Sequence, residues 1–75
     1  MTEQMYKTMM KKYEAQIEDA ILKIDTICES TIIIPEHIDI TGEIDKLLQT
    51  ISEAEDKVAS LWKHYGKNKA DKGVL

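Results

Sequence analysis

The sequence predicts an all-α protein, a two-helix antiparallel hairpin of the coiled-coil type, and two observations carry that prediction. Each half of the 75-residue chain holds seven apolar residues spaced alternately three and four apart, which places them on one face of an α-helix. Between the halves, residues 30–40 contain a β-branched run followed by Pro35, and both disfavour helix. Two apolar stripes joined by such a connection bury each other when the chain folds back.

The first helix is expected over residues 2–29. Thr2 is a suitable N-cap, and neither Gly nor Pro interrupts the segment that follows. Its stripe consists of Tyr6, Met10, Tyr13, Ile17, Ala20, Ile24 and Ile27.

The second helix is expected over residues 41–65, with Thr41 as its N-cap and Gly66 as its C-terminal stop. Its stripe consists of Ile44, Leu47, Ile51, Ala54, Val58, Leu61 and Tyr65. The hairpin domain therefore covers residues 1–66. The polar tail, residues 67–75, carries no stripe and is expected to be mobile.

The register of the hairpin follows from the two stripes. Antiparallel partners have residue numbers with a constant sum, and a sum of 71 pairs every stripe residue with an apolar one. The rungs run from Tyr6 with Tyr65 at one end to Ile27 with Ile44 at the other. At the two middle rungs a large side chain faces alanine, which lets the layers interdigitate.

Self-association is expected, because a two-helix hairpin has too thin a core to be stable by itself. Further apolar residues widen the stripes, as they do in helical bundles. They are Met5, Met9, Ile21, Cys28, Leu48 and Trp62. The predicted assembly is a homodimer that forms a four-helix bundle. Cys28, with acidic neighbours, is interpreted as a small core residue rather than a reactive thiol.

Charge is divided along the hairpin. Residues 1–12 and 57–75, which meet at one end, hold eight Lys and two acids, whereas residues 13–56 hold twelve acids and two Lys. The aromatic and Met residues lie in the basic half. Three interpretations follow: a dimer in which basic ends cover acidic middles, a surface that docks another protein, and a site for nucleic acid or nucleotide phosphates.

The candidate residues differ between these interpretations. Protein docking uses Trp62 as the anchor, together with Tyr65, Tyr6 and Met9, and with Ile32 and Ile33 of the connection, which otherwise cap the end of the bundle. Phosphate binding uses Lys7, Lys11, Lys63 and Lys67.

Several functional classes are disfavoured by what the sequence lacks. It has no Ser–His–Asp arrangement, no Gly-rich phosphate loop and no paired-Cys spacing, so we expect no enzyme, no cofactor and no metal. The net charge of −4 argues against general nucleic-acid binding. The longest apolar run, residues 32–34, is too short to span a membrane, and the single Cys and the absence of a signal-like segment predict a cytoplasmic protein.

The function expected from these features is a non-enzymatic protein-interaction or assembly module. Small size, acidity and the lack of catalytic motifs are typical of accessory and inhibitor proteins of phages and bacteria. The layout is similar to that of small antiparallel hairpin dimers such as the plasmid copy-control RNA-binding proteins, a likeness of topology alone. That resemblance implies a dimer of hairpins.

Overall fold

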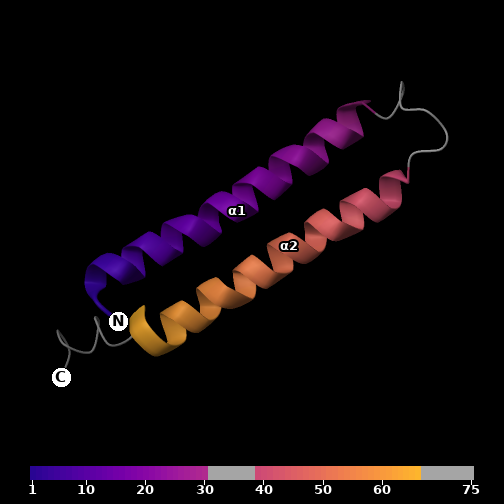
Figure 1. Ribbon diagram of the computed structural model, residues 1–75. Helices are drawn as coiled ribbons and strands as arrows, with labels where there is room; N and C mark the ends of the chain where they lie inside the picture. Colours follow the sequence, from indigo (N-terminus) through magenta and orange to yellow (C-terminus); the bar gives the residue numbers. More distant parts are fainter. Residues whose placement is uncertain (31–38, 67–75) are drawn as a thin grey trace.

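The computed structural model describes residues 1–30 and 39–66, which form a hairpin of two long helices (Figure 1). Helix α1 spans Glu3–Ser30, helix α2 spans Ile40–Leu61, and a π-helical turn, η1, spans Trp62–Gly66. The helices lie side by side and antiparallel, so the N-terminus and η1 meet at one end. The predicted all-helical, two-helix fold is confirmed. The expectations for the connection and for the tail concern residues 31–38 and 67–75, outside the described residues.

Helix α1 begins where the sequence predicts. The backbone N–H of Met5 donates to Thr2 Oγ1 at 3.1 Å, and the N–H of Tyr6 donates to the Thr2 carbonyl at 2.9 Å. Thr2 Oγ1 therefore satisfies one of the N–H groups that a helix leaves unpaired at its start, and the Thr2 carbonyl accepts the first regular bond of the helix.

Helix α2 begins one residue earlier than predicted, because Asp39 rather than Thr41 is the N-cap. The N–H of Gly42 donates to Asp39 Oδ1 at 3.0 Å, and the Thr41 hydroxyl donates to the same oxygen at 3.2 Å. A Cβ at residue 42 would collide with the Asp39 carboxylate. The absent side chain at Gly42 thus allows the carboxylate to reach the helix N-terminus, where the helix dipole favours negative charge.

The core of the hairpin is a single seam. Its most buried apolar side chains among the described residues are Tyr6, Ala20, Ala54 and Leu61. Of the fourteen predicted stripe residues, all the others except Tyr65 are half-buried. The Lys57 ammonium lies 5.5 Å from the centre of the Tyr13 ring on the facing helix, a contact that agrees with the predicted antiparallel register.

The end of the seam differs from the prediction. Tyr65 is 40% exposed, and Gly66 is buried in its place. A π-helical turn adds about one residue to the four of an α-helical step, so the position five residues after Leu61 returns to the seam. The predicted pairing of Tyr6 with Tyr65 is therefore wrong.

Gly66 also does not end the helix in the predicted way. No described glycine has a positive φ, so Gly66 is not a left-handed helix stop. A Cβ there would lie 2.6 Å from Tyr6 Oη and would overlap the Trp62 ring. The residue must be glycine because two aromatic side chains occupy the space of its side chain.

Replacing Gly66 by Ala should therefore destabilise the protein. Alanine normally stabilises a helix relative to glycine, but overpacking here costs about 1–3 kcal/mol in the free energy of unfolding. Urea denaturation followed by circular dichroism measures the change, and Ser60→Ala, at an exposed position near the end of α2, should shift it by less than about 0.5 kcal/mol. A gain in stability for Gly66→Ala would show that the two rings move aside freely.

Candidate interaction surfaces

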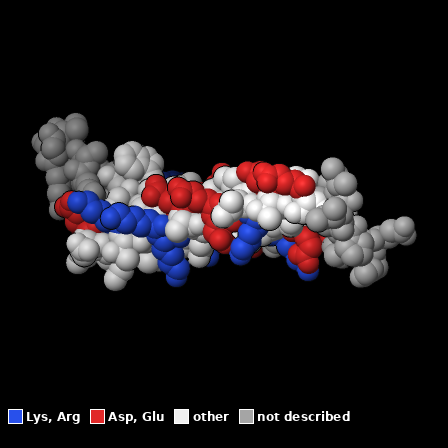
Figure 2. All heavy atoms as spheres, turned by 90° about the horizontal axis from the view of Figure 1, so that it is seen from above, with Lys and Arg blue, Asp and Glu red and all other residues white. Residues whose placement is uncertain are grey.

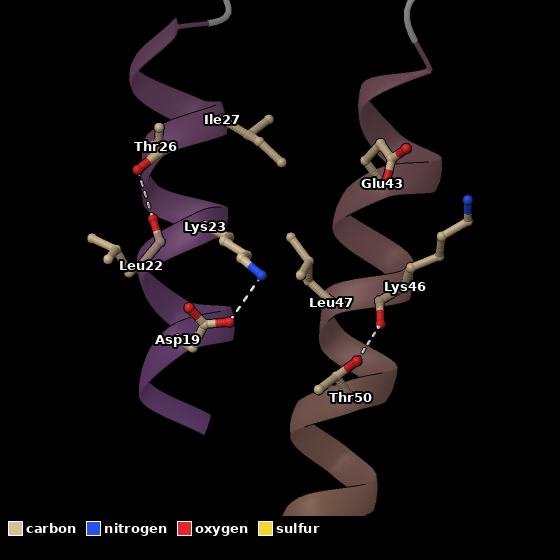
Figure 3. Close-up of a pocket in the computed structure, with 9 residues that line it drawn as sticks. All are labelled: Asp19, Leu22, Lys23, Thr26, Ile27, Glu43, Lys46, Leu47 and Thr50. Atoms are coloured by element: carbon tan, nitrogen blue, oxygen red, sulfur yellow. Dashed lines mark hydrogen bonds and ion pairs between the residues drawn. The ribbon is translucent and has the colours of Figure 1, made fainter. Parts of the chain in front are cut away.

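A groove of about 550 Å³ lies between the helices, toward the end where the connection joins them (Figure 3). It is lined on α1 by Asp19, Leu22, Lys23, Thr26 and Ile27, and on α2 by Glu43, Lys46, Leu47 and Thr50. The side chains of Ile27 and Leu47 point into the space between the helices, whereas Leu22 points outward at the rim. The groove thus has an apolar floor and a charged border.

The polar groups of the groove bond within their own helices. The Thr26 hydroxyl donates to the Leu22 carbonyl at 2.8 Å, and the Thr50 hydroxyl donates to the Lys46 carbonyl at 3.2 Å. Lys23 Nζ lies 2.9 Å from Asp19 Oδ2 in an ion pair four residues apart. None of these bonds joins α1 to α2, so these polar side chains at the border of the groove do not hold the two helices together.

The groove belongs to a longer strip, which we call the groove flank. It comprises Asp19, Lys23 and Thr26 of α1, and Glu43, Lys46, Thr50, Glu53 and Lys57 of α2. Glu53 and Lys57 are on this strip because each follows a groove residue by seven positions, two turns of a coiled-coil helix. Gln49 Nε2 donates to Glu53 Oε2 at 3.1 Å, and the cation–π contact with Tyr13 holds Lys57 on this side.

The other side of the seam is a second surface, which we call the Trp62 flank. Ile21 and Leu48 each lie two residues from a groove lysine, hence about 200° around their helices from the groove. Trp62 follows Leu48 by two heptads. The side chains of Ile21, Leu48 and Trp62 are 46%, 52% and 55% exposed. Their surroundings on this flank are Lys7, Lys11, Glu14, Glu18, Asp25, Asp45 and Glu55, all exposed.

The residues predicted to dock a protein differ in how exposed they are in the structure. Trp62 and Tyr65 are exposed, although one edge of the Trp62 ring packs against Gly66. Met9 is half-buried. Tyr6 is only 8% exposed, and its ring lies in the seam beside Gly66, so little of its surface is accessible to a partner. Ile32 and Ile33 are the remaining candidates, and both lie outside the described residues.

The lysines predicted to bind phosphate lie at one end but do not converge. Lys7 forms an ion pair with Glu3 at 3.3 Å, and Lys11 is exposed one turn further along α1. Lys63 is exposed on η1, where it directly follows Trp62. Lys67 lies outside the described residues.

The predicted division of charge is visible on the surface. In Figure 2, a row of Lys side chains runs along the hairpin near the N-terminal end, and Asp and Glu side chains are prominent over the middle and toward the other end, where some Lys side chains also lie beside them. On this face, the largest group of Lys side chains is thus toward the N-terminal end. Such a pattern steers the approach and orientation of a charged partner.

Cys28 is exposed, so its interpretation as a core residue is wrong. It lies one position beyond Ile27, on the Trp62 side of the stripe, which the facing helix of the hairpin does not bury. Across residues 1–30 and 39–66, no three His, Cys, Asp or Glu side chains gather as a metal site would require. Neither described helix is long and apolar enough to cross a membrane.

Sequence reasoning missed the groove, because its shape depends on how closely two helices approach. Two small polar residues beside the apolar stripes, Thr26 and Thr50, could have indicated the groove, because each stands near a pair of oppositely charged residues. Comparison with known proteins adds no further assignment: no family model matches the chain, and no curated protein or solved structure is significantly similar to it.

Proposed function

We propose that this chain is a non-enzymatic interaction module that pairs with a second copy into a four-helix bundle and binds another protein through the Trp62 flank. The observation that carries the proposal is the exposure of Ile21, Leu48 and Trp62, three large apolar side chains on one flank. Apolar patches with a polar border are typical of protein-binding surfaces, and Trp is enriched among the residues that contribute most to binding.

Self-association is supported by the small core. The four most buried apolar side chains of the described residues include two alanines, which have little apolar surface to bury. The stripe residues around them are only half-buried. A second hairpin would cover these side chains and supply the burial that chains of this size lack.

The partner protein is expected to present an amphipathic helix with apolar and basic side chains. The Trp62 flank carries five acids, Glu14, Glu18, Asp25, Asp45 and Glu55. The basic residues that the structure describes on this flank are Lys7 and Lys11, both at the Trp62 end. A helix with a lysine-bordered apolar stripe would match both the apolar residues and the net negative charge of this flank.

Fluorescence of the single tryptophan, Trp62, provides the test. The probe is a synthetic amphipathic helix of Leu and Lys, with its Leu and Glu counterpart as a charge control. We expect the Leu and Lys peptide to bind and to shift the emission to shorter wavelength as the ring leaves water. The double variant Ile21→Ser, Leu48→Ser keeps every charge and should weaken binding at least tenfold.

Leu22→Ser is the matched control, since Leu22 is 65% exposed but lies off this flank. If it weakens binding as much as the double variant, binding is not specific to the Trp62 flank, and if neither variant weakens binding, the peptide recognises charge alone. Either outcome contradicts the docking proposal. A single-stranded RNA probe tests the alternative, a phosphate site at the lysine-rich end shown in Figure 2. RNA binding that is lost in Lys7→Glu, Lys63→Glu would favour that alternative.

A further inference from the structure

We infer that the groove flank is the surface on which the second copy packs, with the two hairpins antiparallel about a two-fold axis at the level of Thr50. This inference rests on the self-association proposed above and adds the surface, the orientation and the register. It is carried by the order of charges along the groove flank, together with the observed register of the hairpin.

The charges of α2 reverse sign when reflected through Thr50. Glu43 and Lys57 stand seven residues before and after Thr50. Lys46 and Glu53 stand four before and three after it. An antiparallel copy of the same helix, centred on Thr50, therefore places each acid opposite a lysine. Opposite charges at an isologous interface repeat by symmetry, so each pairing occurs twice.

Helix α1 reverses sign at the same level. The apolar stripes predict that residue numbers summing to about 71 face each other across the seam, and the contact of Lys57 with Tyr13 agrees with this register. The level of Thr50 on α1 is thus residue 21, midway between Asp19 and Lys23. These two residues already form an ion pair within one chain. One two-fold axis therefore places opposite charges against each other on both helices, although the sequence of charges along α1 differs from that along α2.

The two-fold axis lies between the stacked hairpins and perpendicular to their helices, so α1 packs on α1 of the second copy and α2 on α2. Lys46 then faces Glu53 of the second copy, and Glu43 faces its Lys57. Asp19 and Lys23 of the two copies form a square of alternating charges. Glu43 and Lys46 make no ion pair with any described residue of their own chain, so they are available for these contacts.

Apolar contact accompanies the ion pairs near the axis. Leu22, at the rim of the groove and 65% exposed, lies one residue from the level of the axis, so the two copies bring their Leu22 side chains together. The floor of the groove, Ile27 and Leu47, is covered at the same time. The ends that carry Trp62 project beyond the described helices of the second copy, which leaves the Trp62 flank available to another protein.

The Trp62 flank does not have this symmetry. A two-fold rotation about an axis at the level of Thr50, applied to the Trp62 flank, would place Asp45 against Glu55 of the second copy, and Asp25 against its Glu18. Like charges at such short range oppose association. The two flanks are therefore suited to different partners: the groove flank to a second copy, and the Trp62 flank to a protein of opposite charge.

Charge reversal tests the pairing of Lys46 with Glu53. These residues are seven apart, about 10.5 Å along one helix, so they cannot pair within a chain. Lys46→Glu and Glu53→Lys should each weaken dimerisation about tenfold in sedimentation velocity, because each creates two repulsive contacts. The double variant restores opposite charges and should return the dissociation constant to within about threefold of the wild-type value.

Glu55→Lys is the matched control, with the same charge change two residues away on the opposite flank. It should change the dissociation constant less than twofold. Equal weakening by Glu53→Lys and Glu55→Lys, or no recovery in the double variant, would overturn the inference while leaving self-association intact. A wild-type chain that stays monomeric at every concentration would contradict self-association itself.

Disulfide trapping checks the position of the axis independently of charge. In a Cys28→Ser background, Thr50→Cys should form a disulfide-linked dimer under mild oxidation, since the two Thr50 residues meet at the axis. Ser52→Cys, on the Trp62 flank, should remain largely unlinked. Efficient linkage through Ser52→Cys, with none through Thr50→Cys, would show that the copies meet on the other flank.

Discussion

Replacing Tyr6 by Ala is expected to lower the free energy of unfolding by about 3 kcal/mol, the cost typical of removing a buried aromatic side chain. Tyr6 is 8% exposed and closes the end of the seam against Gly66. Tyr65 lies one residue from Gly66 but is 40% exposed, so Tyr65→Ala should cost less than about 1 kcal/mol. Urea unfolding at a fixed protein concentration measures both changes.

The comparison of the two tyrosines distinguishes a π-helical end from an α-helical one. A continuous α-helix would bring Tyr65 into the seam opposite Tyr6, and the two substitutions would then have similar effects. Equal losses would therefore contradict the π-helical turn at residues 62–66. Tyr6→Phe separates the ring from its hydroxyl, and it should retain most of the stability if packing of the ring is the main contribution.

Leu61→Ala should be the second strongly destabilising substitution, with a loss of about 2–3 kcal/mol. Leu61 is 8% exposed and is the last fully α-helical residue of the seam on α2. Its removal leaves a cavity that the thin hairpin fills only in part, because one layer of side chains separates the two helices. Loss of the far-ultraviolet helical signal at a lower urea concentration reports the change.

Leu48→Ala is the control for Leu61→Ala, since it removes the same atoms from the same helix at a site that is 52% exposed. It should cost less than about 1 kcal/mol in the absence of a partner. If the two variants are equally destabilised, Leu48 is buried in solution, and a second copy covers the Trp62 flank. That outcome would also count against the placement of the dimer interface on the groove flank.

The candidate sites were predictable in part. The exposed Trp62 and the separation of basic and acidic regions follow from the order of residues, because helical periodicity fixes which side of a helix each residue occupies. The burial of Tyr6 and the exposure of Tyr65 did not follow, because the stripe gives both tyrosines the same role. The exposure of Cys28 was missed for a related reason: a position beside the stripe is covered only when a further helix packs there.

The start of α2 shows where local reasoning is ambiguous. Asp39 and Thr41 are both good N-caps by composition, and both stand just before the apolar stripe. The choice of Asp39 depends on Gly42, whose missing side chain admits the carboxylate. A cap is a geometric arrangement of four residues, so composition at one position does not decide it.

The two stripes were enough to specify two helices and their antiparallel pairing, because apolar periodicity and the demand for apolar partners are properties of residue order alone. The groove, the π-helical turn and the difference between the two flanks required both helices in place. Their physical cause is side-chain volume at the contact between helices. Gly66 lies in the seam because the rings of Tyr6 and Trp62 fill the adjacent space. A periodic pattern of apolar residues does not specify how two facing side chains share that space.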